Sequence, residues 1–181
     1  FLTFSEAYHG DTAATMTLGG VKLFRDAYEP LTFKVLRCPY PMKANNFTHT
    51  DSTPSETREC EKAIAKLEAV FKKHGSSIAG AVIEPGAQGA GGIRPLHPGF
   101  LERLRELCTR HGALLIADEV LTGFGRSGAI FATARERVVP DLLCLAKGLT
   151  SGYLPLSVTI ASEKVYAAFK GRHEEYRHLF H

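Results

Sequence analysis

The sequence over residues 113–119 reads Ala113-Leu114-Leu115-Ile116-Ala117-Asp118-Glu119. An unbroken apolar run is followed directly by two carboxylates. A continuous apolar run of this length, without the alternation of a half-exposed strand, is typical of a strand buried on both faces of a parallel sheet. We therefore interpret 113–117 as an inner strand of an α/β fold.

Other apolar runs predict further strands. They cover residues 1–4, 78–83, 141–146 and 156–160. Helical periodicity alternates with these runs, because apolar side chains recur at helical spacing in 59–73 and again from Pro98 to residue 110. We predict shorter helices from a cap at Asp11 or Thr12 to Leu18, and over 162–169. This alternation predicts a mostly parallel sheet that is flanked by helices on both faces.

Residues 26–58 are expected to form an irregular excursion or surface loop. Pro30, Pro39, Pro41 and Pro54 interrupt this segment, and residues 43–57 are almost wholly polar. Long loops of this kind often carry function.

Composition and charge exclude several classes of protein. The chain has 181 residues, 44% of them hydrophobic, and its 22 Lys and Arg exceed its 19 Asp and Glu by a net charge of only +3. We expect no membrane span, because no apolar run approaches about 18 residues, and no nucleic-acid partner, because the small charge is spread along the chain. The four cysteines form no C-x-x-C pair, which favours core thiols in a reducing, cytoplasmic setting.

A cluster of histidines near the end of the sequence raises the question of a metal site. His173, His178 and His181 lie close together, but no carboxylate or cysteine at metal-ligand spacing accompanies them. We therefore interpret them as part of a polar segment and expect no metal.

Three predicted strands are each followed by an ionisable residue. These residues are Glu84, Asp118 and Lys147. Ligands of open parallel sheets bind beyond the carboxyl ends of the strands. A lysine desolvated beside a buried strand and a fixed carboxylate meet the requirements of a pyridoxal-phosphate site. From spacing alone, a solvated loop lysine and a helix N-cap remain the simpler explanation.

The residues around these positions favour the pyridoxal-phosphate site over the simpler explanation. The sequence resembles the class III (fold type I) aminotransferases in four motifs, which appear in the family's order along essentially the whole chain. These motifs are Tyr8-His9-Gly10, Ile83-Glu84-Pro85 with Gln88-Gly89-Ala90-Gly91-Gly92, Ala117-Asp118-Glu119-Val120 with Thr122-Gly123-Phe124-Gly125-Arg126-Ser127-Gly128, and Ala146-Lys147-Gly148-Leu149.

The resemblance implies a role for each matching residue. Lys147 would form the Schiff base with pyridoxal phosphate and act as the catalytic proton carrier, and Asp118 would partner the pyridine nitrogen. Tyr8 and His9 would lie beside the cofactor, and Glu84 and Gln88 would frame its site. Tyr8, Asp11 and Lys147 would contact substrate. An arginine at position 126 fits a site residue or a structural ion pair equally well.

Within the family, one branch matches best. Tyr8-His9-Gly10-Asp11-Thr12 and Gly152-Tyr153-Leu154-Pro155-Leu156 resemble the branch that serves biotin synthesis. The implied donor is S-adenosylmethionine and the implied acceptor is 8-amino-7-oxononanoate, which yields 7,8-diaminononanoate. Val120-Leu121 and Ser157-Val158 depart from the usual residues without touching the chemistry.

Two alternatives remain open. The chain could come from another class III enzyme, such as an ω-amino acid:pyruvate aminotransferase, or it could be an inactive piece that only binds or associates. We expect residues 1–181 to be an internal part of the cofactor-binding large domain of a homodimer. By resemblance, a phosphate-binding turn would precede Phe1, and a carboxylate-binding arginine and a Gly-x-Thr segment would follow His181.

Overall fold

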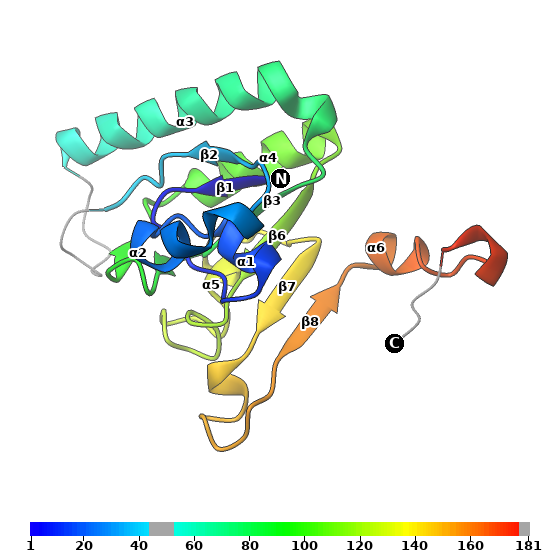
Figure 1. The fold of residues 1–181 in the computed structure, drawn as a ribbon. Coiled ribbons are helices and arrows are strands. Elements are labelled where there is room, and N and C mark those ends of the chain that lie inside the picture. The colour runs from blue at the N-terminus through cyan, green and yellow to red at the C-terminus, as the bar shows by residue number, and fades with distance from the viewer. Residues whose placement is uncertain (44–52, 178–181) are drawn as a thin grey trace.

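A computed structural model describes residues 1–43 and 53–177. Its main sheet has six strands in the order β2-β1-β3-β6-β7-β8 (Figure 1). These strands are β1 (Leu2–Phe4), β2 (Leu36–Cys38), β3 (Gly80–Ile83), β6 (Leu114–Asp118), β7 (Leu142–Leu145) and β8 (Val158–Ala161). Every neighbouring pair is parallel except β7 with β8. The mostly parallel sheet is therefore confirmed, with the 113–117 run as an inner strand.

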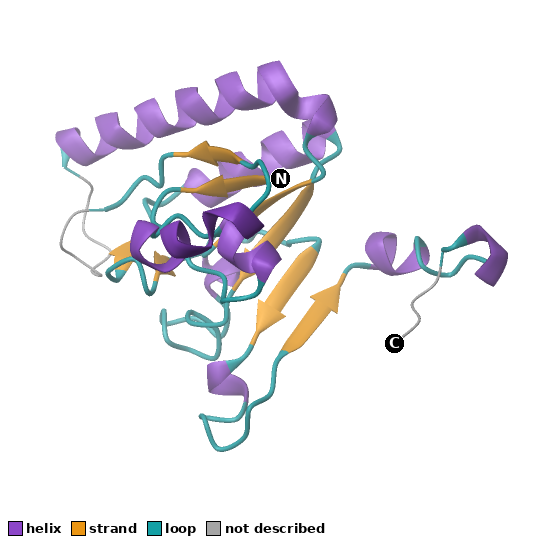
Figure 2. Ribbon diagram, in the orientation of Figure 1, coloured by secondary structure: helices purple, strands orange, loops and turns teal. Residues whose placement is uncertain are grey.

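Helices and short turns connect the strands (Figure 2). The α-helices are α1 (Ala13–Leu18), α2 (Lys22–Arg25), α3 (Pro54–His74), α4 (Phe100–His111), α5 (Ala132–Arg135) and α6 (Glu163–Ala167). The 3₁₀ turns are η1 (Asp26–Leu31), η2 (Gly75–Ser77), η3 (Lys147–Leu149) and η4 (His173–Glu175). A small hairpin pairs β4 (Ala87–Gln88) with β5 (Arg94–Pro95).

Strand β1 shows how the two faces of the sheet are covered. Successive side chains of a strand point to opposite faces. Phe4 stacks edge-on against Phe100 of α4, with ring centroids 5.6 Å apart. Thr3 donates a hydrogen bond at 2.8 Å to the carbonyl of Leu18 at the end of α1. Helices α4 and α1 therefore lie on opposite faces, as the sequence predicted for this half of the sheet.

The hydrophobic core lies between the sheet and the pair α3–α4. Leu67 and Phe71 of α3 and Leu101 and Leu104 of α4 are fully buried there. These are the positions at which apolar residues recur at helical spacing in the sequence. Helix α4 begins after Gly99, one residue beyond Pro98, and is followed by the cap residue Gly112, whose φ of +71° suits glycine.

The other end of the sheet differs from the prediction. All four residues of β8 are exposed, and the strand runs antiparallel to β7. Residues 146–157 connect the two strands with one 3₁₀ turn and no crossover helix, and a connection of this kind returns the chain antiparallel to its neighbour. The expectation that the 156–160 run forms a strand covered on both faces is therefore wrong within the described residues.

The predicted irregular excursion over 26–58 is also partly wrong. It contains η1 and the edge strand β2, and α3 begins at Pro54 instead of residue 59. Thr53 caps α3 in a capping box with Glu56, with Pro54 in the first turn. The first turns of α3 carry few apolar side chains, so hydrophobic periodicity missed them. Residues 44–52 lie outside the described residues.

The predicted start of the first helix is confirmed at one of its two candidate caps. Thr12 caps α1, because its side chain accepts a hydrogen bond from the Thr15 N–H, and Gly19 follows the last residue of the helix. The turn over residues 8–11 therefore lies directly between the end of β1 and the capped start of α1.

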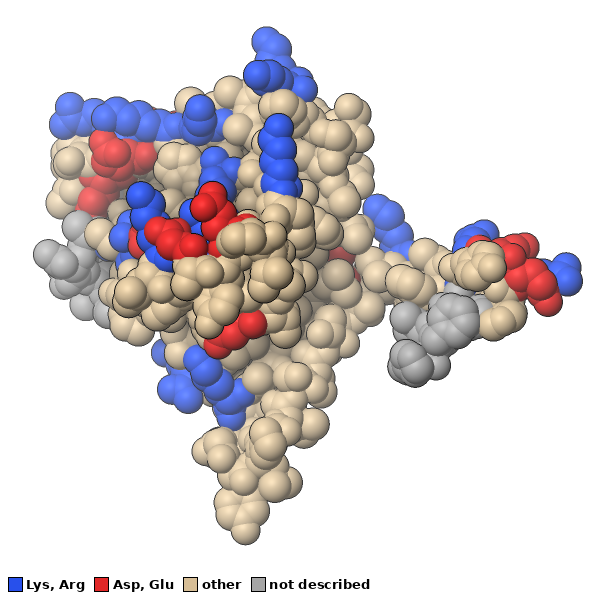
Figure 3. All heavy atoms as spheres, in the orientation of Figure 1, with Lys and Arg blue, Asp and Glu red and all other residues tan. Residues whose placement is uncertain are grey.

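Surface charge is less even than the sequence indicated. Figure 3 shows Lys and Arg side chains along the outer surface of α3, where Arg58, Lys62 and Lys66 are exposed. Acidic side chains lie beside them. Among the described helices, none combines the length and the apolar character that a membrane crossing needs. Of the three histidines considered for a metal, His173 lies in η4, whereas His178 and His181 lie outside the described residues.

A half-buried ion pair ties α4 to the start of β7. Arg105 Nη1 and the Leu115 N–H both donate to Asp141 Oδ2, at 2.7 and 2.8 Å. Burial opposes ionisation of Asp141, but Arg105 and the Leu115 N–H outweigh it and lower the pKa of this carboxyl. Because the folded pKa lies below the unfolded value, Asp141 stabilises the fold at neutral pH and loses that effect as the pH falls through the folded pKa.

We predict that Asp141→Asn lowers the free energy of unfolding by about 1–2 kcal/mol at pH 7. The difference from wild type should shrink as the pH falls below about 4, near the unfolded pKa of aspartate. Urea unfolding at several pH values measures both effects. Asp26→Asn is the matched control, because Asp26 is exposed. A difference that is independent of pH would contradict the assignment.

Candidate functional site

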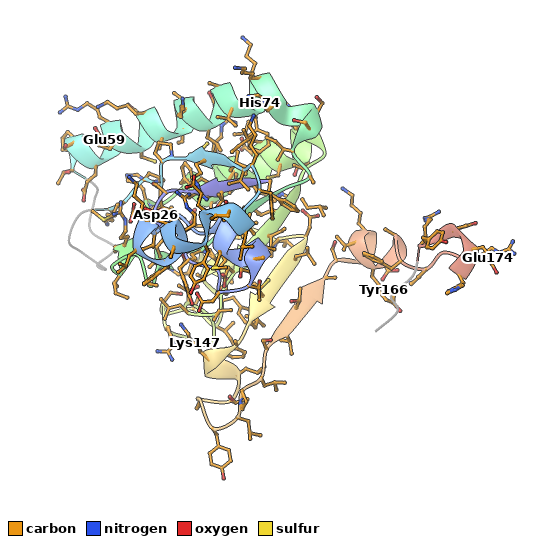
Figure 4. The ribbon with its side chains drawn as sticks, viewed as in Figure 1. Asp26, Glu59, His74, Lys147, Tyr166 and Glu174 are labelled. Atoms are coloured by element: carbon orange, nitrogen blue, oxygen red, sulfur yellow. The ribbon has the colours of Figure 1, made fainter. Side chains whose placement is uncertain are left out.

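The three strand-end residues predicted from sequence lie around one pocket. Strands β3, β6 and β7 are neighbours, so their carboxyl ends meet at one edge of the sheet. A pocket of about 290 Å³ lies at this edge, and Figure 4 shows Lys147 beyond the end of β7. Its walls include Tyr8, His9, Glu84, Asp118, Leu121 and Lys147.

Asp118 is the last residue of β6, and both of its carboxylate oxygens are held. His9 Nδ1 lies 2.7 Å from Oδ2, and the Val120 N–H donates to Oδ1 at 3.1 Å. The side chain of Asp118 is 12% exposed and that of His9 is 3% exposed. Asp118 therefore presents a fixed carboxylate to the pocket, held from the turn after β1 and from its own turn.

Glu84 is a buried carboxylate that joins two loops of the pocket. The Tyr8 N–H donates to its Oε1 at 3.0 Å and the Gly89 N–H to its Oε2 at 2.9 Å. Burial raises the pKa of Glu84, and the two N–H groups and nearby His9 counteract only part of this effect. Glu84 thereby positions the loop after β1 and the turn after β4 against each other.

Tyr8, in the wall of the pocket, forms a polar pair with Asp11. The Tyr8 hydroxyl donates to Asp11 Oδ2 at 2.9 Å, and the Tyr8 ring packs edge-on against Phe24. The hydrogen bond to Asp11, with a smaller effect of burial, raises the pKa of the Tyr8 phenol. Asp11 lines a small neighbouring hollow and not the main pocket.

Lys147 follows β7 in a strained turn. Its φ of +36° is unusual for a residue with a side chain. The next residue, Gly148, lies so close to Phe124 that an added Cβ would come within 2.8 Å of the Phe124 Cβ. The side chain of Lys147 is exposed, so the desolvation that the sequence suggested is not supplied by the described residues.

Gln88 and Arg126 lie outside this pocket. Gln88 is fully buried, and its Nε2 donates to the Ser5 carbonyl at 2.7 Å, which ties β4 to the turn after β1. Arg126 is exposed and lines a second pocket of about 460 Å³ together with Arg135. Leu121 lies in the walls of both pockets.

Glu119 has a role that sequence reasoning missed. It is fully buried, and its carboxylate accepts three hydrogen bonds, from the Ala132 N–H at 2.6 Å, the Thr133 N–H at 2.8 Å and the Thr133 hydroxyl at 2.7 Å. These bonds close the loop over residues 120–131, whose residues Val120 and Leu121 line the pocket. A charged residue directly after a buried strand was a visible signal, but its partners 13 and 14 residues later were not.

We predict that Glu119→Gln destabilises the protein by about 2–3 kcal/mol, because its amide group would face N–H donors that need an acceptor. Thermal or urea unfolding measures the loss. Faster hydrogen exchange at the Ala132 and Thr133 amides should accompany it. Glu61→Gln, at an exposed position of α3, is the matched control. Equal stability of the two variants would show that the buried bonds contribute nothing.

Comparison with known proteins gives concordant matches. A family model described as "Aminotransferase class-III" matches residues 1–175. The adenosylmethionine-8-amino-7-oxononanoate aminotransferase of Geobacter sulfurreducens is 44% identical over 181 residues, which are all of this chain and 39% of that protein. The enzyme of the same name from Aquifex aeolicus is 41% identical over the same span. The chain thus spans about 39% of the length of these relatives.

Solved structures show the same likeness. The crystal structure of the adenosylmethionine-8-amino-7-oxononanoate aminotransferase from Methanocaldococcus jannaschii matches with a TM-score of 0.83 and 32% identity, over all of this chain and 38% of that one. An amine transaminase from an uncultivated Pseudomonas species, in its PLP-bound form, matches with a TM-score of 0.87 and 34% identity, over 100% and 40% of the two chains.

Proposed function

Because the chain belongs to the class-III aminotransferases, we propose that the protein carrying it transfers amino groups with pyridoxal phosphate as cofactor. We further propose S-adenosylmethionine as donor and 8-amino-7-oxononanoate as acceptor, which would place the product, 7,8-diaminononanoate, in biotin synthesis. The observation that carries the chemistry is the meeting of Asp118 and Lys147 in one pocket. The names of the similar enzymes support the substrates.

The residues around the pocket fit this cofactor. A pocket of about 290 Å³ is near the lower limit of about 300 Å³ for small-molecule sites. It offers an amine at Lys147, a carboxylate at Asp118 whose two oxygens are held, and the aromatic ring of Tyr8. These are the groups needed to bind an aldehyde, a protonated ring nitrogen and a ring face, respectively.

Each residue has a distinct part in this proposal. When bound, pyridoxal phosphate supplies an electron sink for the carbanion that forms at the substrate. Lys147 would bind the cofactor's aldehyde carbon through Nζ, and Asp118 would hold the ring nitrogen protonated. Tyr8 and His9 lie beside the cofactor, while Glu84 and Gln88 keep the surrounding loops in register.

Proton transfer is assigned to Lys147. Once the donor's amino group has replaced the lysine amine at the cofactor's aldehyde carbon, the freed Nζ would take the proton from the α-carbon of the donor and deliver it to that aldehyde carbon, as general base and then acid. Lys147 is exposed and lines the pocket, which would let its amine reach a substrate bound there. Tyr8, in the wall of the pocket, and Asp11, which accepts a hydrogen bond from the Tyr8 hydroxyl, would contact the incoming substrate.

A comparison of amino donors tests the substrate assignment. The full-length protein is incubated with pyridoxal phosphate, 8-amino-7-oxononanoate and either S-adenosylmethionine or alanine, and 7,8-diaminononanoate is measured by mass spectrometry. We expect product with S-adenosylmethionine. Product with alanine alone would overturn that donor and favour the alternative, an ω-amino acid:pyruvate type enzyme. The alternative draws support from the similarity to solved ω-transaminases, one of them 31% identical with a TM-score of 0.80.

Family membership also supports a cytoplasmic homodimer as the working assembly. Exposed apolar side chains on the β7–β8 arm, among them Tyr153, Leu154 and Ile160, are consistent with further packing there. Sedimentation equilibrium of the full-length protein checks the assembly, and a monomer with full activity would contradict it.

A further inference from the structure

His9 has one hydrogen-bond partner within residues 1–43 and 53–177, the carboxylate of Asp118. It lies in the turn after β1, whereas Asp118 ends β6, and β3 lies between these two strands. The contact therefore spans the carboxyl end of β3, where Glu84 holds the backbone N–H of the neighbouring residue Tyr8. The turn that carries His9 is thus itself fixed.

The direction of the His9 hydrogen bond follows from its partner. An ionised carboxylate only accepts, so Nδ1 carries the proton and donates to Asp118 Oδ2 at 2.7 Å. The other ring nitrogen, Nε2, is buried and has no hydrogen-bond partner among the described residues. Burying a ring nitrogen without a hydrogen-bond partner costs free energy that an apolar side chain at this position would not cost. The hydrogen bond from Nδ1 to Asp118 is therefore the interaction that a histidine provides here and an apolar residue could not.

The second oxygen of Asp118 completes the arrangement. Oδ1 accepts from the Val120 N–H, which holds the carboxylate from its own turn. The Val120 bond alone would leave the carboxylate free to rotate about it. With His9 on Oδ2, the plane of the carboxylate is fixed from two elements of the fold.

We propose that His9 is a positioning residue, which orients the Asp118 carboxylate through the hydrogen bond from Nδ1, and not a direct contact of the cofactor. This inference rests on the proposed function and refines the role that the sequence resemblance implied for His9. It differs from a structural role, because His9 would act on cofactor binding through Asp118.

A pair of near-isosteric variants separates these roles. In His9→Asn the side-chain amide nitrogen can take the place of Nδ1, whereas in His9→Gln it falls closer to Nε2. In the full-length protein we expect His9→Gln to weaken pyridoxal-phosphate affinity by about 10-fold, the order found when a group that orients a ligating residue is lost. His9→Asn should restore most of this loss. Equal losses in both variants would contradict donation from Nδ1.

A double-mutant cycle with Asp118→Asn provides the decisive measurement. If His9 acts through Asp118, His9→Gln should cause no further loss of cofactor affinity in the Asp118→Asn background. The same loss in both backgrounds would overturn the proposal, because a direct contact or simple packing would be additive. Thermal unfolding of each variant shows whether the fold is retained.

A measurement without cofactor keeps this inference separate from the proposed function. The ¹⁵N resonances of His9 in the cofactor-free protein should show a proton on Nδ1 and should shift in Asp118→Asn. If wild type binds no pyridoxal phosphate, the proposed function fails, and these resonances still test the His9–Asp118 contact. An unprotonated Nδ1, or resonances unaffected by Asp118→Asn, would overturn the inference even if the cofactor binds.

Discussion

Replacement of Lys147 by alanine should lower kcat for amino transfer by at least about 1,000-fold, within the range attributed to a positioned general base. In the proposed mechanism Lys147 would supply both the amine that binds the cofactor and the group that moves the proton, so the two functions would be lost together. Its turn is strained and lies against Phe124, and no other lysine lines the pocket formed by the described residues. A steady-state assay of the full-length protein measures the loss.

Trapping of the cofactor provides an independent check on Lys147. Borohydride reduction followed by peptide mass mapping should place the cofactor on the peptide that contains Lys147 in wild type and leave the Lys147→Ala protein unlabelled. Lys72→Ala, at an exposed position of α3, is the matched control and should behave as wild type. Labelling that survives in Lys147→Ala, together with retained activity, would rule out the assignment.

Replacement of Asp118 by asparagine should have the second largest effect. An opposite charge within about 4–6 Å shifts the pKa of a group by about 1–3 units. Losing the charge of Asp118 should lower the pKa of the cofactor's ring nitrogen by a similar amount. The protonated fraction, and with it kcat, should then fall by about 10- to 1,000-fold, because each pKa unit is a tenfold change.

The Asp118 prediction has two matched controls. Asp26→Asn removes an exposed carboxylate that does not line the pocket, and it should leave kcat unchanged. Asp141→Asn removes a half-buried carboxylate that pairs with Arg105 and should alter stability without altering kcat. Activity of Asp118→Asn equal to that of these two variants would show that Asp118 does not partner the ring nitrogen.

Much of the fold could be predicted from local pattern. The apolar runs that became β1, β3, β6 and β7, and the helical spacing in α3 and α4, are properties of short segments. Strand β2 was missed because three residues between prolines carry no measurable period. The direction of β8 was not visible in its own residues, because it depends on the connection over 146–157.

Part of the candidate site could likewise be predicted from local sequence, and part depended on the tertiary structure. That Glu84, Asp118 and Lys147 follow apolar strands is written in the sequence, and parallel strands in neighbouring positions bring such residues together. The exposure of Lys147 was not predictable, because burial depends on segments distant in sequence. Likewise, the hydrogen bonds of Glu119 to Ala132 and Thr133 depend on how the loop over 120–131 closes.

The sequence by itself determined the α/β class, the family resemblance and the identity of the residues at the strand ends, because each of these depends on residue type and local spacing. The tertiary structure decided which side chains act on one another. His9 and Asp118 lie 109 positions apart in the chain and meet at 2.7 Å. The order β1-β3-β6 and the Glu84 bond to the Tyr8 N–H set that distance, and neither can be seen in the residues of one segment.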